Sequence, residues 1–297
     1  MVPVMHKTAE LAPARVMDMN KDNIAVSALY TAATWRWARF DCAEFVTPAK
    51  AQSIFRLVNA FMFFYRLLNP RVFSLQHQLL HRHSAIDYLL WHAGNQRVVE
   101  VACGLSARGS RFSANPAIHY VELDLPDMVS FKLCQLAGSE QGRAVLARKN
   151  FELRAADVTT LDFAHEFAGG PISVITEGLM MYFPREVQLV IWKRIADLLH
   201  TSGGDYLFDY VPSGDEPQRS WLGNALHLFK EKVLGLRNDF KYDGRTRADV
   251  VRDLQDCGFE VVEANNTGDV ARPWSLPDAN VPSRTIIYHC RCTGGRS

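Results

Sequence analysis

The chain has 297 residues, of which 48% are hydrophobic and 11% aromatic. That is enough apolar material for one large domain with an appendage or for two small domains. Its 33 basic and 32 acidic residues leave a net charge of +1, and the two signs are interspersed along the chain. This composition argues against a nucleic-acid partner and against binding to an anionic membrane surface.

The sequence predicts a soluble, cytoplasmic protein. The first twenty residues contain no apolar core long enough for a signal peptide. The apolar run 54–68 carries Arg56, Asn59 and Arg66 and is shorter than the roughly 20 residues that span a bilayer. None of the six cysteines forms a CxxC pair, so we expect reduced thiols and no structural zinc site.

The first third of the chain has a helical pattern. After an arm over residues 1–20, alanines and large apolar residues recur at spacings of three and four from residue 25 to residue 91. Breaks are predicted at Thr47-Pro48 and at Asn69-Pro70. We therefore expect residues 1–94 to form an N-terminal arm and a helical cap.

After Gly94-Asn95, short β-rich runs alternate with helical stretches, which predicts βα units and a mainly parallel sheet over residues 95–297. Segment 212–243 is predicted to be a helical insertion or a lid over the site. The predicted strands are 98–102, 117–122, 151–155, 172–176, 206–210, 259–263 and 285–290. The predicted helices of this region are 107–114, 128–137, 140–149, 185–200, 218–234 and 246–257.

The turn after the first predicted strand indicates an adenosine-containing cofactor. It reads Ala102-Cys103-Gly104-Leu105-Ser106-Ala107, and Asp124 ends the next strand twenty positions after Gly104. This pattern places a helix N-terminus under the ligand and a carboxylate at its ribose. A dinucleotide enzyme needs G-x-G-x-x-G for its pyrophosphate, whereas S-adenosylmethionine has no phosphate and a looser turn suffices. A dehydrogenase is therefore disfavoured.

Acidic residues follow the predicted strands one after another. Glu122 and Asp124 end the second strand, Asp157 follows the third and Glu177 follows the fourth. The carboxyl ends of parallel strands meet at one edge of a sheet, where ligands of open α/β folds bind. There, Asp157 could accept a hydrogen bond from an adenine amino group, and Val158 could pack on the ring. Each acidic residue alone could be a helix cap or a turn residue, but the four together indicate a site.

Three sequence blocks carry a resemblance to a known family: VVEVACGLSARGSRF, HYVELDLPDMVSFK and ITEGLMMYFP. With them, most of the chain from Asn23 to Arg291 resembles the leucine carboxyl methyltransferases. That family includes protein phosphatase methyltransferases and bacterial polyketide O-methyltransferases of the tetracenomycin type. The resemblance implies a Rossmann-like class I methyltransferase fold, with a mainly parallel seven-stranded sheet and an N-terminal helical cap. It also implies S-adenosyl-L-methionine as methyl donor and S-adenosyl-L-homocysteine as product.

The resemblance assigns cofactor-binding roles by position. Arg82 would hold the methionine carboxylate, Asp124 would bind the ribose hydroxyls, and Glu177 would lie near the sulfonium and the amine. The other expected cofactor neighbours are Glu100, Ala102, Gly104, Leu125, Asp157, Val158 and Gly178. The chain has Ala102 and Ser106 where the family has a glycine and an aspartate, which we interpret as a tuned site.

The choice of acceptor decides whether the reaction needs a base. A carboxylate is already ionised at pH 7, whereas a phenol or an alcohol must lose a proton. The catalytic candidates are Tyr182, Tyr210 and His227, with Asp209 as a further possible base. Although His77, His81 and His83 are clustered, the sequence offers no carboxylate or cysteine at a matching spacing, and no metal site is predicted.

Three hypotheses about function follow. The first is an O-methyltransferase for a carboxylate or hydroxyl of a small, polyketide-like metabolite, because a helical cap, an apolar stripe around Phe55, Phe61, Phe63 and Phe64, and a long insertion suit a closed pocket. The second is a methyltransferase for a protein C-terminal carboxylate, which would need an open charged groove. The third is a non-catalytic cofactor-binding protein, for which Ala102 and Ser106 would be the signature. A homodimer through the sheet edge or the cap is compatible with all three.

Overall fold

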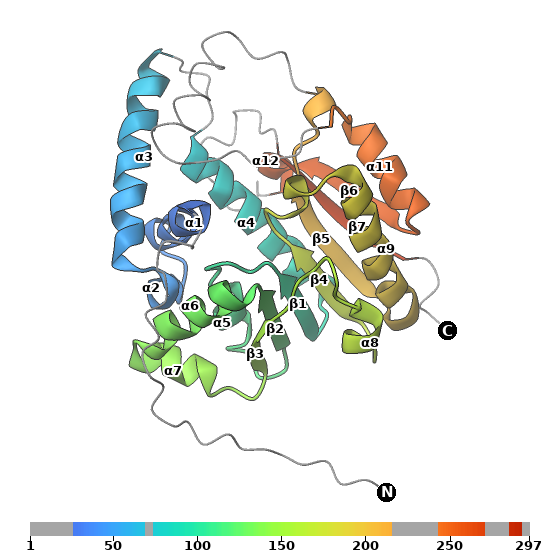
Figure 1. Ribbon diagram of the computed structural model, residues 1–297, viewed down its shortest axis with the longest axis horizontal. Coiled ribbons are helices and arrows are strands. Elements are labelled where there is room, and N and C mark those ends of the chain that lie inside the picture. Colours follow the sequence, from blue (N-terminus) through green and yellow to red (C-terminus); the bar gives the residue numbers. More distant parts are fainter. Residues whose placement is uncertain (1–25, 69–73, 216–242, 271–284, 293–297) are drawn as a thin grey trace, which may run out of the picture.

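The computed structural model describes residues 26–68, 74–215, 243–270 and 285–292. Its centre is a seven-stranded sheet in the order β3-β2-β1-β4-β5-β7-β6. The strands are β1 (Arg97–Val101), β2 (His119–Asp124), β3 (Phe151–Ala155), β4 (Ile172–Thr176), β5 (Gly204–Tyr210), β6 (Glu260–Asn266) and β7 (Ile286–Arg291). The strands β1 to β5 pair in parallel, and β7 is antiparallel to both of its neighbours. Each predicted strand overlaps an observed one, and the predicted α/β class is confirmed (Figure 1).

The helices before the sheet follow the predicted breaks. They are α1 (Val26–Trp37), α2 (Ala43–Val46), α3 (Ala49–Leu68) and α4 (Leu75–Ala93). The Thr47-Pro48 break separates α2 from α3 because proline disfavours a helical conformation at the residue before it. None of the described helices is long and apolar enough to cross a bilayer.

Among the helices that alternate with the strands, those predicted at 107–114 and 140–149 are shorter than predicted. The observed helices of this region are α5 (Arg108–Phe112), α6 (Pro126–Ala137), α7 (Glu140–Leu146), α8 (Phe163–Phe167), α9 (Arg185–Ser202), α11 (Arg247–Asp256) and α12 (Thr267–Val270). Helix α7 stops at Leu146, and the Asn150 side chain then donates to the carbonyls of Ser113, Asn115 and Ile118. This tie fixes the turn before β3, so the predicted helix 140–149 was too long. The predicted helix 218–234 lies outside the described residues.

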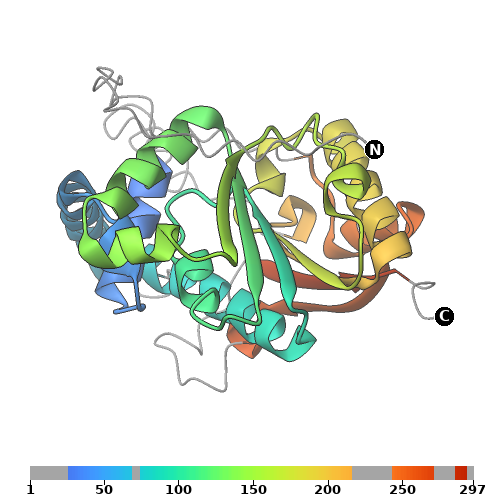
Figure 2. The same ribbon diagram turned by 90° about the horizontal axis from the view of Figure 1, so that it is seen from below.

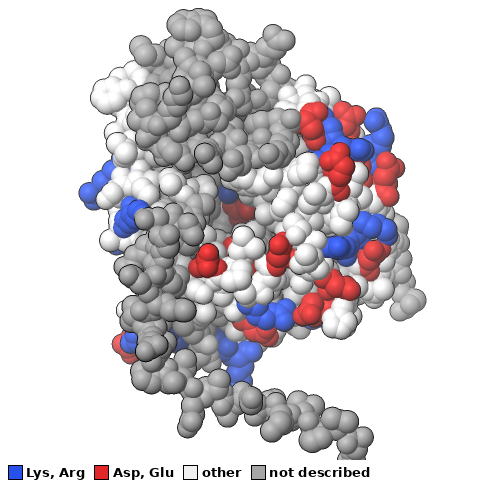
Figure 3. Space-filling model, viewed as in Figure 1, with Lys and Arg blue, Asp and Glu red and all other residues white. Residues whose placement is uncertain are grey.

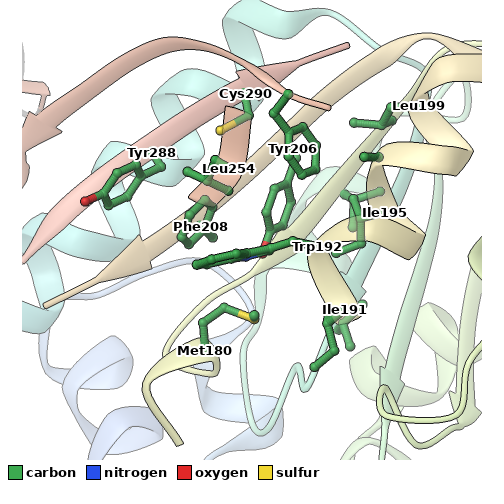
Figure 4. Close-up of a cluster of buried hydrophobic side chains, with 14 of the residues drawn as sticks. Met180, Ile191, Trp192, Ile195, Leu199, Tyr206, Phe208, Leu254, Tyr288 and Cys290 are labelled. Carbon is green, nitrogen blue, oxygen red and sulfur yellow. The ribbon is translucent and has the colours of Figure 1, made fainter. Parts of the chain in front are cut away.

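Helices cover both faces of the sheet (Figures 1 and 2). Helices α9 and α11 contact β4, β5 and β6, whereas α4 to α7 and α12 contact the strands from the other side. Strands buried on both faces are mostly continuous apolar runs, as in β4, where all five residues are buried. Figure 4 shows the core under α9, where Trp192 packs against Phe208, and Tyr206 stacks on Phe208.

The cap helices form a further layer beyond the sheet. Helix α1 contacts α2, α3 and α4, and α2 contacts α6. Helix α4 itself contacts β5 and β7, so it links the cap to the sheet. On the face drawn in Figure 3, the basic and acidic side chains of the described residues are mixed and leave uncharged surface between them.

Candidate active site

One cavity of about 840 Å³ opens at the carboxyl ends of β1 to β4. Its walls come from two sources: the loops that follow these four strands, and the helices α1, α3, α4 and α6. Its volume is within the usual range of small-molecule sites, which is about 300–1,000 Å³. Of the acidic residues predicted to form a site, Asp124, Asp157 and Glu177 therefore line a cavity.

The turn after β1 uses two left-handed backbone positions. Ala102 has φ 54° and Gly104 has φ 51°. A Cβ built on Gly104 would meet no atom within 4 Å, so the backbone there faces open space. Ala102 adopts the conformation that glycine adopts readily, and the local shape of the turn is kept without the family's glycine.

Asp124 closes the turn from the end of β2. Its Oδ2 accepts from the backbone N–H of Gly104 at 2.6 Å, and its Oδ1 accepts from the N–H of Leu125 at 2.8 Å. Burial raises the pKa of this carboxyl, and the two amide donors oppose that rise. Leu125 lies beside it and is 55% exposed, and both residues line the cavity.

Ser106 supports the turn through both its hydroxyl and its carbonyl. The hydroxyl accepts from the backbone N–H of Arg108, two residues further on, at 3.1 Å, as serine side chains do in turns. The carbonyl of Ser106 accepts from the Lys132 ammonium at 2.6 Å. Lys132 in turn lies 2.6 Å from Glu122, and both are completely buried. Glu122 therefore does not reach the cavity, and its place at a strand end serves the core.

The loop after β3 supplies one polar and one apolar wall. Asp157 accepts from the backbone N–H and the hydroxyl of Thr159, and these bonds lower its pKa. Val158 is buried beside it, and both line the cavity. The pair therefore lies in the cavity wall, and its contact with an adenine stays a prediction.

Glu177, after β4, is the centre of a buried ionic cluster. Its Oε2 accepts from Arg108 Nη2 at 2.5 Å, and its Oε1 accepts from Arg82 Nε at 2.9 Å. Burial alone would raise the pKa of Glu177, but His83, Arg108 and Arg82 outweigh it and hold the pKa well below its usual range. Glu177 therefore stays ionised and faces the cavity as a fixed negative charge.

Arg108 is the buried cation that links the carboxylates of this cluster. It is fully buried and also donates to Asp87 at 2.6 Å and to Glu100 at 2.5 Å. Tyr120 donates to the other oxygen of Glu100 at 2.8 Å. Glu100 thus reaches the cavity wall while engaged by a buried arginine, and its contact with the cofactor stays a prediction.

His83 meets polar partners at both ring nitrogens. Arg111 Nη2 lies 3.1 Å from its Nε2, and Arg108 Nη2 and Glu177 Oε2 each lie 2.8 Å from its Nδ1. Burial lowers the pKa of His83, and Arg108 lowers it further. The neutral ring stacks on Trp35 with centroids 4.2 Å apart.

Arg82 lies between two carboxylates. Besides Glu177, its Nη1 lies 3.5 Å from Asp209, which also accepts from the backbone N–H of Gly178 at 2.5 Å. Gly178 has φ 67°, and a Cβ there would lie 3.1 Å from the Arg82 guanidinium. Glycine is thus required by conformation and by the close approach of the arginine.

The catalytic candidates fall in three different places. Tyr182 lines the cavity. Tyr210 is buried in the core, accepts from Arg245 at 3.1 Å and is not among the described residues that line the cavity. Asp209 is engaged by Arg82, and burial raises its pKa. His227 lies outside the described residues.

Of the apolar stripe, Phe55 stacks on the cavity-lining Tyr30, whereas Phe63 and Phe64 are exposed.

Sequence reasoning missed the roles of His83 and Arg108. Leu79, Arg82 and His83 line the cavity from one face of α4, with Asp87 one turn further on. Residues three and four apart share a helix face, so this polar stripe is visible in the sequence. The sequence pattern alone related His83 only to His77 and His81, and it did not single out Arg108.

The cavity wall fits a positively charged nucleoside. Four carboxylates line it, from Glu100, Asp124, Asp157 and Glu177, against the single guanidinium of Arg82 among the described lining residues. A sulfonium and an amine would be stabilised next to this wall. The open backbone at Gly104 leaves room for a ligand to approach closely.

The fold and the site together define a class of protein. A doubly covered sheet with β7 antiparallel and acidic strand ends around one cavity is the Rossmann-like fold of the class I methyltransferases. The model of the leucine carboxyl methyltransferase family matches residues 45–196. The chain belongs to this family, as the sequence predicted.

The chain is also similar to other proteins. A protein of Mycobacterium marinum, inferred to be an S-adenosyl-L-methionine-dependent methyltransferase, is 32% identical over 57% of this chain and 56% of its own length. A protein of Mycobacterium ulcerans with the same inferred activity is 32% identical over 66% of each chain. The match thus spans less than two thirds of these relatives. The magnesium protoporphyrin IX methyltransferase of Synechocystis, solved with S-adenosylhomocysteine, has 17% identity and a TM-score of 0.46, covering 75% of this chain and 89% of that one.

Proposed function

We propose that the protein is an S-adenosylmethionine-dependent O-methyltransferase that acts on a carboxylate or hydroxyl of a small metabolite, polyketide-like or another natural product. The observation that carries the proposal is the cavity of about 840 Å³ in which acidic side chains at the strand ends meet the helices α1, α3 and α4. The half of the cavity at the strand ends offers charged side chains for the cofactor, and the half lined by the helices offers apolar surface for an acceptor.

In this proposal each strand end has one task. Asp124 binds the ribose hydroxyls while the amides of Gly104 and Leu125 hold it in place. Asp157 and Val158 flank the adenine. Glu177 faces the sulfonium and the amine, and Arg82 binds the methionine carboxylate through the donors that Glu177 and Asp209 leave available.

The chemistry requires alignment and exclusion of water more than proton transfer. The cofactor supplies an electrophilic methyl group: the acceptor oxygen bonds to its carbon while the sulfur keeps the pair of the broken C–S bond. A hydroxyl acceptor also releases its proton to solvent water. The protein's part is to hold the acceptor in line, which can lower the barrier by several kcal/mol. Tyr182 is the catalytic candidate that lies in the cavity wall and can orient the acceptor.

Two alternatives are less well supported. A protein C-terminal carboxylate would approach a wall that carries four carboxylates and one guanidinium. That guanidinium, on Arg82, is already engaged by Glu177 and Asp209. A non-catalytic role would rest on Ala102 and Ser106, but Ala102 keeps the left-handed turn and the Ser106 hydroxyl accepts from the backbone N–H of Arg108. Both departures leave the cavity intact.

Calorimetric titration with S-adenosylmethionine, S-adenosylhomocysteine and NAD tests the cofactor. We expect binding of the two sulfur nucleosides, no binding of NAD, and loss of binding in Asp124→Ala. Asp197→Ala is the matched control, because Asp197 is an exposed residue of α9 paired with Lys193. Failure of the unmodified protein to bind either sulfur nucleoside would contradict the proposal.

A further inference from the structure

Asp209, near the end of β5, is a buried acid behind the cavity wall. Its side chain is shielded from solvent, and it is not among the described residues that line the cavity. A catalytic base must come within hydrogen-bond distance of the proton that it accepts. Asp209 therefore acts on a bound ligand through its neighbours and not by direct contact.

Both carboxylate oxygens of Asp209 hold groups of the cavity wall. Oδ1 accepts from the backbone N–H of Gly178 at 2.5 Å, and Oδ2 lies 3.5 Å from Arg82 Nη1. Gly178 and Arg82 both line the cavity. They also approach each other closely, because a Cβ on Gly178 would lie 3.1 Å from Arg82 Nη1. Asp209 thus holds, from behind, the two sides of one contact between α4 and the loop after β4.

The Arg82 guanidinium is held at two of its three nitrogens. Nε donates to Glu177 at 2.9 Å, and Nη1 faces Asp209. Nη2 makes no hydrogen bond to the residues that the structure describes. A guanidinium is planar and rigid, so fixing two nitrogens also fixes the direction in which the third presents its N–H groups. The two carboxylates that fix it come from the neighbouring strands β4 and β5.

Building on the proposed function, we infer that Asp209 is a positioning residue for the amino-acid end of the cofactor. It holds Arg82 against the Gly178 turn, so that Nη2 meets the cofactor carboxylate while Glu177 meets the amine. An arginine that is ordered before the ligand arrives loses less conformational freedom on binding. Asp209 itself does not contact the cofactor and takes no proton in the reaction.

Charge and position predict opposite effects for the removal of this carboxylate. The negative charge of Asp209 by itself repels a ligand carboxylate, so a purely electrostatic role predicts tighter binding in Asp209→Asn. A positioning role predicts weaker binding. The asparagine keeps an oxygen for the Gly178 N–H but offers Arg82 no anionic partner, and Nη2 is then no longer held in one direction.

Two ligands that differ only at the amino-acid end test the inference. S-Adenosylhomocysteine carries that end, whereas 5′-methylthioadenosine has the same nucleoside and sulfur with a methyl group in its place. In calorimetric titrations, Asp209→Asn should bind S-adenosylhomocysteine at least about tenfold more weakly than the unmodified protein. Its affinity for 5′-methylthioadenosine should change less than about twofold. Equal losses for both ligands, or an unchanged or tighter binding of S-adenosylhomocysteine, would overturn the inference.

A double-mutant cycle tests whether Asp209 acts through Arg82. Arg82→Met should itself weaken S-adenosylhomocysteine binding. Adding Asp209→Asn to Arg82→Met should then change the affinity less than about twofold, because the residue that Asp209 positions is gone. If Arg82→Met does not fold, Arg82→Lys replaces it, since lysine keeps the charge but not the planar fork. Losses that simply add would contradict the inference.

Asp205→Asn is the matched control. Asp205 is a second buried aspartate of β5, and it accepts from His289 at 2.5 Å and from Arg291 at 2.7 Å. It lies at the opposite end of the strand, so its substitution should leave the ratio of the two affinities unchanged. Failure of the unmodified protein to bind S-adenosylhomocysteine would contradict the proposed function, and this inference with it. Binding by the unmodified protein with equal losses in Asp209→Asn would contradict this inference alone.

Discussion

Arg108 Nη2 lies 2.5 Å from Glu177 Oε2, and the arginine is fully buried. Arg108 begins the helix after β1, and Glu177 directly follows the neighbouring strand β4. The bond therefore joins two consecutive walls of the cavity, and the same guanidinium reaches Asp87 of the cap helix α4. The geometry of the cofactor half depends on this one side chain.

Removal of Arg108 should be strongly destabilising. Arg108→Met leaves Glu100, Glu177 and Asp87 buried without their shared cation, and breaking such a network typically costs about 3–5 kcal/mol. Urea denaturation measures the free energy of unfolding. Arg108→Lys should recover only part of the loss, because an ammonium cannot match the planar fork that serves three carboxylates. Near-normal stability of Arg108→Met would show that the cluster does not hold the site.

Stability should fall in acid through Asp87. Burial raises its pKa, but Arg111, His83 and Arg108 outweigh burial and lower the pKa from 3.8 to about 2. A carboxyl with a lowered folded pKa stabilises the protein above its unfolded pKa, and this contribution is lost as the pH falls from about 4 toward 2. Its size at neutral pH is about 2 kcal/mol.

The variant Asp87→Asn checks this pH dependence. Its free energy of unfolding should lie below that of the unmodified protein at pH 6, and the gap should shrink as the pH is lowered through 4. A gap that is constant with pH would mean that Asp87 acts through packing and not through its charge.

Ala102→Gly should stabilise the protein. A non-glycine residue in the left-handed region costs about 1–2 kcal/mol, and Ala102 has φ 54°. Part of the relief is offset by the greater freedom of glycine in the unfolded chain, so we expect a gain of about 0.5–1 kcal/mol in thermal or urea unfolding.

Gly104→Ala is the mirror control for Ala102→Gly. Gly104 has φ 51°, and a Cβ there meets nothing within 4 Å, so the loss of about 1 kcal/mol is conformational and not steric. If both substitutions destabilise, the shape of the turn is set by contacts and not by backbone preference.

Two arginines share Asp253 but should differ in importance. Arg245 is buried and lies 2.5 Å from Asp253, and it also donates to Tyr210 and Gln188. Arg185 lies 2.6 Å from the same carboxylate, but its side chain is 47% exposed. We expect Arg245→Met to cost about 3–5 kcal/mol and Arg185→Met less than 1 kcal/mol, as measured by urea denaturation. Equal costs would contradict the role of burial.

The sequence predicted the framework better than the interior of the site. Hydrophobic runs ending in Gly104, Asp124, Asp157 and Glu177 placed four strand ends at one edge, because parallel strands must meet there. It did not predict that Glu122 pairs with Lys132 in the core. Glu122 and Asp124 are two positions apart and share one face of the strand, yet they meet different neighbours, and the strand pattern does not say which. The contacts of His83 with Arg108 and Arg111 form because α4 and α5 come close together in the fold. Local sequence patterns do not encode this approach.

Tyr210 illustrates the same limit at the other end of β5. Its position at a strand end suggested a catalytic role, yet the residue packs in the core against Arg245. Which side of the sheet a terminal tyrosine faces is decided by a partner that comes 35 residues later in the chain.

The backbone at Arg245 also contacts the segment that follows β5. Its carbonyl accepts from the backbone N–H of Gly214 at 2.8 Å, and Ser213 accepts from the N–H of Gly244 at 3.1 Å. These two bonds join the backbone just after β5 to the backbone just before α11. Because the closure entropy of a connecting segment grows only slowly with its length, an insertion or a deletion between these two points should cost little stability while β5 and α11 keep their places.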